Sequence, residues 1–169
     1  MVRMIPADLT DPRVLDLLSE HLADMRASSP PEAVFALDLA GLRRPEITLW
    51  TAWEGDRVVA CGALREMAPE AGEIKSMRTA RAHQRRGFGR SMLTYLLDQA
   101  RRRGYRRVFL ETGSGPAFAA ALGLYAAAGF EACAPFPPYG PSEFNRFFCL
   151  TLGDGDDARG VEDSPLSVD

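Results

Sequence analysis

Residues 83–105, "HQRRGFGRSMLTYLLDQARRRGY", constrain the fold more than any other stretch of the chain. From the first of two closely spaced glycines on, apolar residues recur at helical spacing on one face, namely Phe88, Met92, Leu93, Leu96, Leu97 and Ala100. The β-rich runs "GEIKSMRT" and "RRVFLET" stand directly before and after this helix. A helix between two strands buries its apolar face against a sheet, so the sequence predicts a layered α/β domain.

The other elements follow from turn and capping signals. "VRMIP" is predicted as a first strand, and a helix follows it, with Thr10 or Asp11 as the cap and Pro12 in its first turn. A shorter helix is predicted from Ser29 to Gly41, because Ser29 and Glu32 have the spacing of a capping box. "EITLWTAW", "EGD" and "RVVACGALREM" predict a β-hairpin. "SGPAFAAALGLYAAAG" predicts a last helix, and "FEACAPF" and "NRFFCLTL" predict two last strands.

Length and charge indicate one folded domain and a tail. The chain has 169 residues, 46% of them hydrophobic, which is enough for one core, and we assign residues 1–152 to a single domain. Residues 153–169 are acidic and show no apolar periodicity, so we expect them to be disordered.

The composition also predicts the compartment. Cys61, Cys133 and Cys149 have spacings that do not suit a metal site, and they are expected to be buried, reduced thiols. The first residues carry charge and proline where a signal sequence needs an apolar run, and no stretch has transmembrane length. We therefore expect a cytoplasmic protein that binds neither metal nor membrane.

The two glycines before the predicted helix suggest an anion site. A Rossmann fingerprint would need a third glycine where Met92 stands, and a P-loop would need Gly-Lys where Gly89 is followed by Arg90. The first turn of a helix still offers free backbone amides, and Gly87 and Gly89 leave the approach to them open. The side chains of Gln84, Arg85, Arg86 and Arg90 add donors, which suits a pyrophosphate.

Two motifs connect this site with a known family. "QRRGFGRSMLTYLLDQARRRGYRRVFLET" resembles the Gln/Arg-x-x-Gly-x-Gly/Ala acetyl-CoA motif of the GNAT superfamily of N-acetyltransferases, and "GLYAAAGF" resembles its downstream Leu-Tyr-x-x-x-Gly-Phe motif. The similarity covers residues 46–152 and is to small bacterial members. It implies a mixed, mostly antiparallel central sheet of about seven strands flanked by about four helices.

The resemblance also implies acetyl-CoA as cosubstrate and assigns residues to it. The backbone of Gln84, Arg85, Arg86, Gly87, Phe88, Gly89 and Arg90 would hold the pyrophosphate, and the main chain of Met77, Arg78 and Thr79 would pair with the pantetheine arm. Many members carry an asparagine after the fifth strand. Here the segment "ETGSGPAF" offers Thr112 and Ser114 as its only side-chain hydroxyls, so they are the candidates for that contact.

Acetyl transfer to an amine needs a base for the ammonium and a proton for the departing thiolate. Tyr125 matches the family tyrosine that protonates the CoA sulfur, although an aromatic in this apolar stretch also suits a core position. Glu73 is the candidate base, and the alternative is a solvated strand end paired with Lys75. Glu111, at the end of the next strand, is its competitor, whereas His83 lies in the phosphate loop.

The acceptor is expected to meet two proline-stiffened segments, "SSPPE" and "PFPPYGPSEF". Candidate contacts are Ser29, Glu32, Glu111, Tyr139 and Glu143, with Glu32 equally explained as a capping residue. Such a shaped pocket favours a primary amine of a small molecule or a peptide. The sequence is compatible with a homodimer as well as with a monomer.

Two other functions fit the sequence less well. A nucleic-acid binder would use Arg101 to Arg107 as a basic stripe, but no aromatic residues interleave with it and the acidic tail would repel nucleic acid. A GNAT-like sensor would bind acyl-CoA without catalysis, and the presence of Tyr125 and an acidic strand residue argues against it. The sequence thus favours an acetyl-CoA-dependent N-acetyltransferase.

Overall fold

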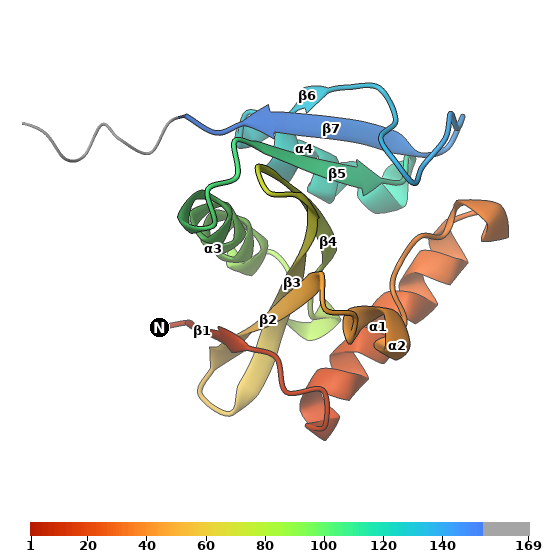
Figure 1. The fold of residues 1–169 in the computed structure, drawn as a ribbon. Helices are drawn as coiled ribbons and strands as arrows, with labels where there is room; N and C mark the ends of the chain where they lie inside the picture. Colours follow the sequence, from red (N-terminus) through yellow and green to blue (C-terminus); the bar gives the residue numbers. More distant parts are fainter. Residues whose placement is uncertain (154–169) are drawn as a thin grey trace, which may run out of the picture.

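A seven-stranded sheet in the order β1-β2-β3-β4-β5-β7-β6 forms the centre of the computed structural model, which describes residues 1–153 (Figure 1). All neighbouring strands are antiparallel except β4 and β5, which run parallel. The strands are β1 (Arg3–Pro6), β2 (Ile47–Glu54), β3 (Arg57–Ala68), β4 (Ala71–Thr79), β5 (Arg107–Thr112), β6 (Glu131–Ala132) and β7 (Arg146–Thr151). The predicted mixed, mostly antiparallel sheet is confirmed.

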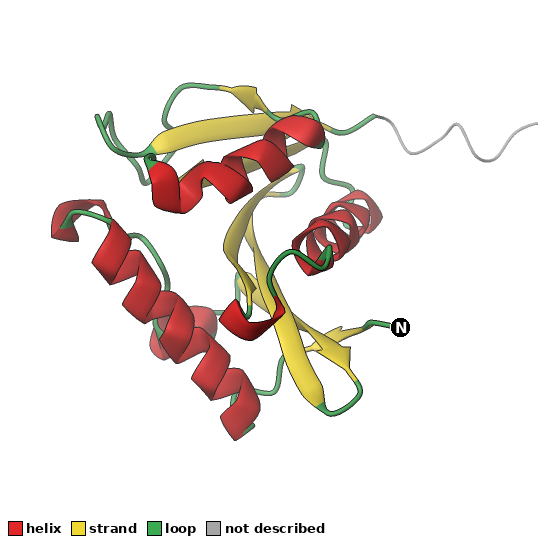
Figure 2. Cartoon of the chain, turned by 180° about the vertical axis from the view of Figure 1, so that it is seen from behind, coloured by secondary structure: helices red, strands yellow, loops and turns green. Residues whose placement is uncertain are grey.

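Four α-helices cover the sheet, as Figure 2 shows: α1 (Pro12–Ser28), α2 (Leu39–Leu42), α3 (Phe88–Arg102) and α4 (Ala119–Ala127). Side chains of a strand alternate between the two faces of its sheet, and β2 and β3 accordingly contribute to two cores. One core joins them to α1 and α2, and the other joins them to α3, α4, β4 and β5. Helices are therefore packed on both faces of the sheet.

Helix α3 has the apolar face that the sequence predicts. All six residues of that face are buried in the second core. The helix comes close to β3 at Gly62, where an added Cβ would meet the side chains of Leu96 at 2.8 Å and Met92 at 2.9 Å. This close packing fixes the position of the first turn of α3 relative to the sheet.

Strands β4 and β5 diverge, and this divergence creates the main opening in the sheet. They pair only from Ala71 to Ile74 on β4, although β4 continues to Thr79. Beyond Ile74 the pairing of β4 with β3 also shifts register, and Ser76 takes a positive φ of 53°. The second half of β4 and the end of β5 are therefore left with backbone groups that face a cavity.

Two predicted elements were wrong in extent. The helix expected from Ser29 to Gly41 is a 3₁₀ turn at Pro31–Ala33, an extended segment and then α2. Ser29 ends α1 in an extended conformation, so the expected capping box does not form, and Asp38 instead accepts from the Gly41 amide at 2.8 Å to start α2. The strand expected over "FEACAPF" is reduced to β6, because Pro135 cannot donate to a ladder.

The remaining expectations are partly confirmed. All three cysteines are free, but only Cys61 is buried. Cys133, which follows the edge strand β6, and Cys149, on the neighbouring strand β7, are partly exposed. Within residues 1–153 no helix combines the length and apolarity needed to cross a bilayer. The tail expected to be disordered lies, from residue 154 on, outside the described residues.

Candidate active site

A cavity of about 660 Å³ opens where β4 and β5 diverge. Its walls come from α1, the segment at 33–36, β4, the start of α3, the end of β5, and α4. Of the residues singled out from the sequence, it brings together Ser29, Glu73, Met77, Arg78, Thr79, Gln84, Arg85, Gly87, Gly89, Arg90, Glu111, Thr112 and Tyr125. Glu32, Arg86, Phe88, Ser114, Tyr139 and Glu143 do not line it.

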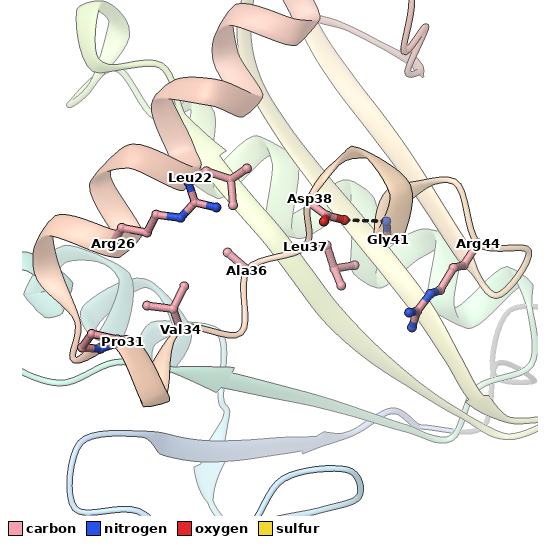
Figure 3. A pocket seen from close by; sticks show the side chains of 9 residues that line it. All are labelled: Leu22, Arg26, Pro31, Val34, Ala36, Leu37, Asp38, Gly41 and Arg44. Carbon is pink, nitrogen blue, oxygen red and sulfur yellow. Dashed lines mark hydrogen bonds between the residues drawn. The ribbon is translucent and has the colours of Figure 1, made fainter.

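A second cavity, of about 610 Å³, lies between α1 and α2 (Figure 3). The two cavities share Val34 and Ala36, so the segment at 33–36 separates them. The charged side chains of the second cavity are Arg26, Arg44 and Asp38, and Asp38 caps α2. This cavity has no residue pair suited to acid–base chemistry, so the first cavity is the candidate active site.

One end of the first cavity is the first turn of α3. Gly87 precedes the helix with φ of 83°, no side chain caps the turn, and Arg85 also has a positive φ, of 65°. The amides of the turn are therefore available to an anion, and a positive helix end favours one. A Cβ on Gly89 would lie 3.3 Å from the Thr79 hydroxyl oxygen, so the missing side chain keeps this approach open.

The arginines of this loop have different roles. Arg85 and Arg90 line the cavity, as expected. Arg86 turns away, and its Nη2 donates to both carboxylate oxygens of Glu54 at 3.0 Å while its guanidinium lies over the Phe88 ring. The Arg86 side chain is therefore held by Glu54 on the neighbouring hairpin rather than by the cavity, and its role at the cofactor stays a prediction. Phe88 itself is buried in the core.

Three residues of the cavity wall carry buried polar atoms without protein partners. The described residues contain four such side-chain atoms, and three of them belong to cavity residues: His21 Nδ1, Ser76 Oγ and Arg78 Nε. Arg78 directs its Nη2 to Glu20 on α1, at 2.7 Å. Buried polar groups normally have hydrogen-bond partners, so these three atoms are exceptions within the wall of the cavity.

Glu73 lies at the other end of the cavity within a dense network. Its side chain is 1% exposed and accepts hydrogen bonds from Arg65 Nε at 2.7 Å and from the Tyr139 hydroxyl at 2.6 Å. Lys75 Nζ lies 3.4 Å from the same oxygen that Tyr139 contacts, and donates to the Tyr139 hydroxyl at 2.6 Å. Both Glu73 oxygens are thus engaged, and the pairing with Lys75 is buried rather than solvated.

Glu111 and Tyr125 face the same cavity. Burial raises the pKa of Glu111, opposed by a hydrogen bond at 2.8 Å that Asn145 Nδ2 donates to one of its oxygens. Burial, and then the charge of Glu111, raises the pKa of Tyr125 to about 12. The pair therefore combines a carboxylate that holds a proton more readily than usual with a phenol that stays protonated at neutral pH.

Four residues that were predicted to contact the cofactor or the acceptor do not line the cavity. Tyr139 belongs to the Glu73 network and packs edge-on against Phe35, with ring centroids 4.9 Å apart. The Ser114 hydroxyl donates to the Phe144 carbonyl at 2.7 Å, which holds the loop before β7. Glu32 and Glu143 are exposed at the surface. Thr112 lines the cavity and is the hydroxyl left for the cofactor contact.

Sequence reasoning missed Arg65 and Asn145, and it took Lys75 only as a surface partner. Asn145 is 3% exposed and bridges Glu111 to the Ala33 carbonyl, which it contacts at 3.1 Å. No local motif marks these residues, because their partners are far away in the sequence. An asparagine just before an apolar strand was the one available signal.

Buried His21 should make the stability of the fold sensitive to acid. Burial, and then the charge of Arg78, lowers the pKa of His21 to about 4, against opposing effects of Asp24 and Glu20. The unfolded chain binds this proton at about pH 6.5, so stability is full above that pH and falls by about 1.4 kcal/mol per unit down to about pH 4. We expect urea unfolding from pH 7.5 to 4.5 to show a shallower loss in His21→Met than in the unmodified chain.

The other histidine is the control for this experiment. His83 is only half-buried and lies in the loop before α3, so His83→Met should keep the pH dependence of the unmodified chain. Equal slopes in the unmodified protein and His21→Met would contradict the assignment.

Comparison with known proteins agrees with the geometry. The sequence matches the Acetyltransferase (GNAT) family over residues 14–130. It is 50% identical over 145 residues to the uncharacterized N-acetyltransferase YsnE of Bacillus subtilis, covering 86% of this chain and 96% of that protein.

Solved structures show the same fold. An acyl-CoA N-acyltransferase structure from Klebsiella pneumoniae superposes with a TM-score of 0.76 at 25% identity, covering 90% of this chain and 99% of the other. A GNAT acetyltransferase structure from Elizabethkingia anophelis, with acetyl-CoA bound, gives a TM-score of 0.66 at 20% identity over 89% and 98% of the two chains. With the family match, the diverging strands and the glycine-led helix, the chain belongs to the GNAT family and is an acyl-CoA-dependent acetyltransferase.

Proposed function

We propose that this enzyme transfers the acetyl group of acetyl-CoA to a primary amine of a small molecule or peptide, with Tyr125 as general acid and Glu111 as general base. The observation that carries the proposal is one cavity that joins an anion-binding helix end to a paired carboxyl and phenol. The bound acetyl-CoA in a structure of the same fold supports the choice of cosubstrate.

The residues present fit this cosubstrate. The amides before and within the first turn of α3, with Arg85 and Arg90, would hold the pyrophosphate. The pantetheine arm carries amide and hydroxyl groups, and the second half of β4, which no longer pairs with β5, offers backbone groups along its path. Acetyl-CoA supplies the activated acyl carbon.

The proposed step balances in protons and bonds. The amine nitrogen forms a bond to the acyl carbon, and the bond from that carbon to sulfur breaks. Glu111 accepts one of the three protons of the incoming ammonium and passes it to solvent, which leaves a neutral amine. After attack on the acyl carbon, Glu111 accepts a second proton from nitrogen, the phenol of Tyr125 donates its proton to the leaving sulfur, and the proton taken up by Glu111 restores the phenol by way of solvent. The third proton stays on the amide nitrogen.

Glu111 is favoured over Glu73 as the base because of their partners. Glu73 is held by Arg65, Tyr139 and Lys75, whereas the hydrogen bond from Asn145 engages one of the two Glu111 oxygens. A carboxylate with a raised pKa is also the better proton acceptor near neutral pH. Glu73 then serves to anchor Lys75 and the loop that carries Tyr139.

The test is release of free CoA thiol from acetyl-CoA across a panel of primary amines. The proposal expects amine-dependent release with formation of the acetylated amine. Tight CoA binding without release from any amine would instead favour an acyl-CoA sensor.

Gly87→Ala should weaken CoA binding about tenfold in calorimetric titration. Gly87 has φ of 83°, which alanine adopts with strain, and relaxation of that strain rotates the first amides of α3 away from the anion. Gly55→Ala is the matched control, because Gly55 also has a positive φ, of 60°, and open space around its Cβ position, but lies in the β2–β3 turn. Both variants should lose about 1 kcal/mol of stability. Unchanged CoA affinity in Gly87→Ala would contradict the role of this turn.

A further inference from the structure

The acceptor end of the cavity carries two opposite charges, on Lys75 and Glu111. Lys75 is the single lysine of the chain, and all the other residues in its count of lysine plus arginine are arginines. We propose that the acceptor is an amine that also carries a carboxylate, an amino acid or a closely related zwitterion, with its carboxylate on Lys75 and its amine on Glu111. The inference rests on the proposed acetyl transfer and names its substrate class.

The positive charge of Lys75 is only partly compensated by its protein partners. Arg65 and Lys75 share the single carboxylate of Glu73, and Arg65 holds it at 2.7 Å while Lys75 is 3.4 Å away. The short contact of Lys75 is to the Tyr139 hydroxyl, an uncharged group, at 2.6 Å. The Lys75 side chain is only 9% exposed, so water does little to compensate its charge. An ammonium has three N–H donors, and these two contacts leave one for a ligand.

The charge count of the site favours a zwitterion. Arg65 and Lys75 carry positive charge and Glu73 and Glu111 carry negative charge, so these four groups sum to zero. A simple ammonium would add an unbalanced positive charge beside Lys75, and burial of unpaired charge is costly. An acceptor that carries both an ammonium and a carboxylate keeps the sum at zero. Lys75 also lowers the pKa of Glu111 in part, so the two charges lie within electrostatic reach of each other.

The surroundings indicate where the rest of the acceptor lies. Phe35, Phe118 and Phe144 line the same cavity, and Val34 and Ala33 extend this apolar wall. Phe35 is 38% exposed, so it stands at the mouth of the site. An apolar side chain on the amino acid would cover these rings.

The first test compares matched acceptors on the unmodified enzyme. Phenylalanine is paired with phenethylamine, and leucine with isoamylamine, so that each pair differs in the carboxylate. We expect kcat/KM for CoA thiol release to be at least about tenfold higher for the amino acid of each pair, because a buried cation is left unpaired by the amine. Equal or reversed preference would overturn the inference while leaving acetyl transfer intact. Absence of release from every amine would overturn the proposed function itself.

The second test uses Lys75→Met with Lys75→Arg as the control. Methionine keeps the length of the apolar stem without the charge, and the preference for the carboxylate should fall to about equality, whereas arginine should retain most of it. If Lys75 only holds Tyr139, Lys75→Met would lower kcat/KM equally for both acceptors of a pair. An unchanged ratio of the two kcat/KM values would therefore overturn the inference. The comparison of acceptors on the unmodified enzyme does not depend on the folding of either variant.

Discussion

Glu111→Gln should lower kcat by about 100-fold or more, because it removes the group that we propose accepts protons from the amine. Glutamine keeps the size of the side chain and an oxygen that can accept the hydrogen bond from Asn145, so the cavity wall should stay in place. CoA affinity should be unchanged, since the helix end proposed to hold the pyrophosphate lies at the other end of the cavity. Steady-state kinetics with one fixed amine, together with calorimetric titration of CoA, measure the two effects separately.

The pH dependence gives a second and independent readout of this variant. A carboxylate base works only when deprotonated, and burial raises the pKa of Glu111, so kcat should fall as pH drops through that raised value. This acid limb should disappear in Glu111→Gln, whose remaining turnover depends on solvent as the base.

Glu73→Gln is the matched control for the same experiment. Its loss leaves Lys75, which is 9% exposed, and the partly exposed Arg65 without a carboxylate, so a drop in stability of about 3 kcal/mol is expected. The acid limb of kcat should nevertheless remain. Loss of the limb in Glu73→Gln with its retention in Glu111→Gln would reverse the assignment of the base.

The elements that the sequence predicts well are those whose signals are local. The apolar face of α3 and the glycine-containing turn between β2 and β3 depend on residues a few positions apart, and both are found in the structure. The helix expected from Ser29 failed because Asp38 caps a later turn and competes with Ser29. The strand predicted over "FEACAPF" was too long, because Pro135 cannot donate to a ladder and β6 is limited to Glu131–Ala132.

The candidate site follows the same division. The glycines before α3 could be assigned to an anion because helix ends bind anions wherever the chain presents them. The roles of Glu73 and Glu111 could not be ranked, because the difference lies in partners distant in sequence. Tyr139 reaches Glu73 across 66 positions, and Asn145 reaches Glu111 across 34. The pairing of Arg86 with Glu54 could not be predicted for the same reason, since Glu54 precedes it by 32 positions.

The positive φ of Ser76 is a further feature that no sequence signal marks. It coincides with the register shift between β3 and β4 and with the point where β4 leaves β5. A non-glycine residue in this conformation is uncommon, and such strain concentrates at functional sites. Ser76 lines the cavity and its buried hydroxyl has no protein partner, so this irregularity belongs to the wall of the candidate site.

Tyr125→Phe should lower kcat by about 10- to 100-fold and leave CoA affinity nearly intact. The variant removes one hydroxyl from a residue that is 7% exposed, and the ring keeps its packing against Phe130, with centroids 5.8 Å apart. Because the pKa of Tyr125 is raised to about 12, the phenol is protonated at every pH used for assay. The defect should therefore be uniform across pH and add no new limb, which distinguishes it from the loss in Glu111→Gln.

Tyr105→Phe provides the control, since it removes the same hydroxyl from another buried tyrosine outside the cavity. Tyr105 is 4% exposed, its hydroxyl has no partner within residues 1–153, and its ring packs over Gly72. Turnover should be unchanged in this variant, and its thermal stability should be unchanged or slightly higher, because an unsatisfied buried group is lost. Single-turnover measurements with saturating acetyl-CoA would isolate the chemical step in both proteins. Turnover in Tyr125→Phe equal to that in Tyr105→Phe would remove Tyr125 from the mechanism and leave protonation of the thiolate to solvent.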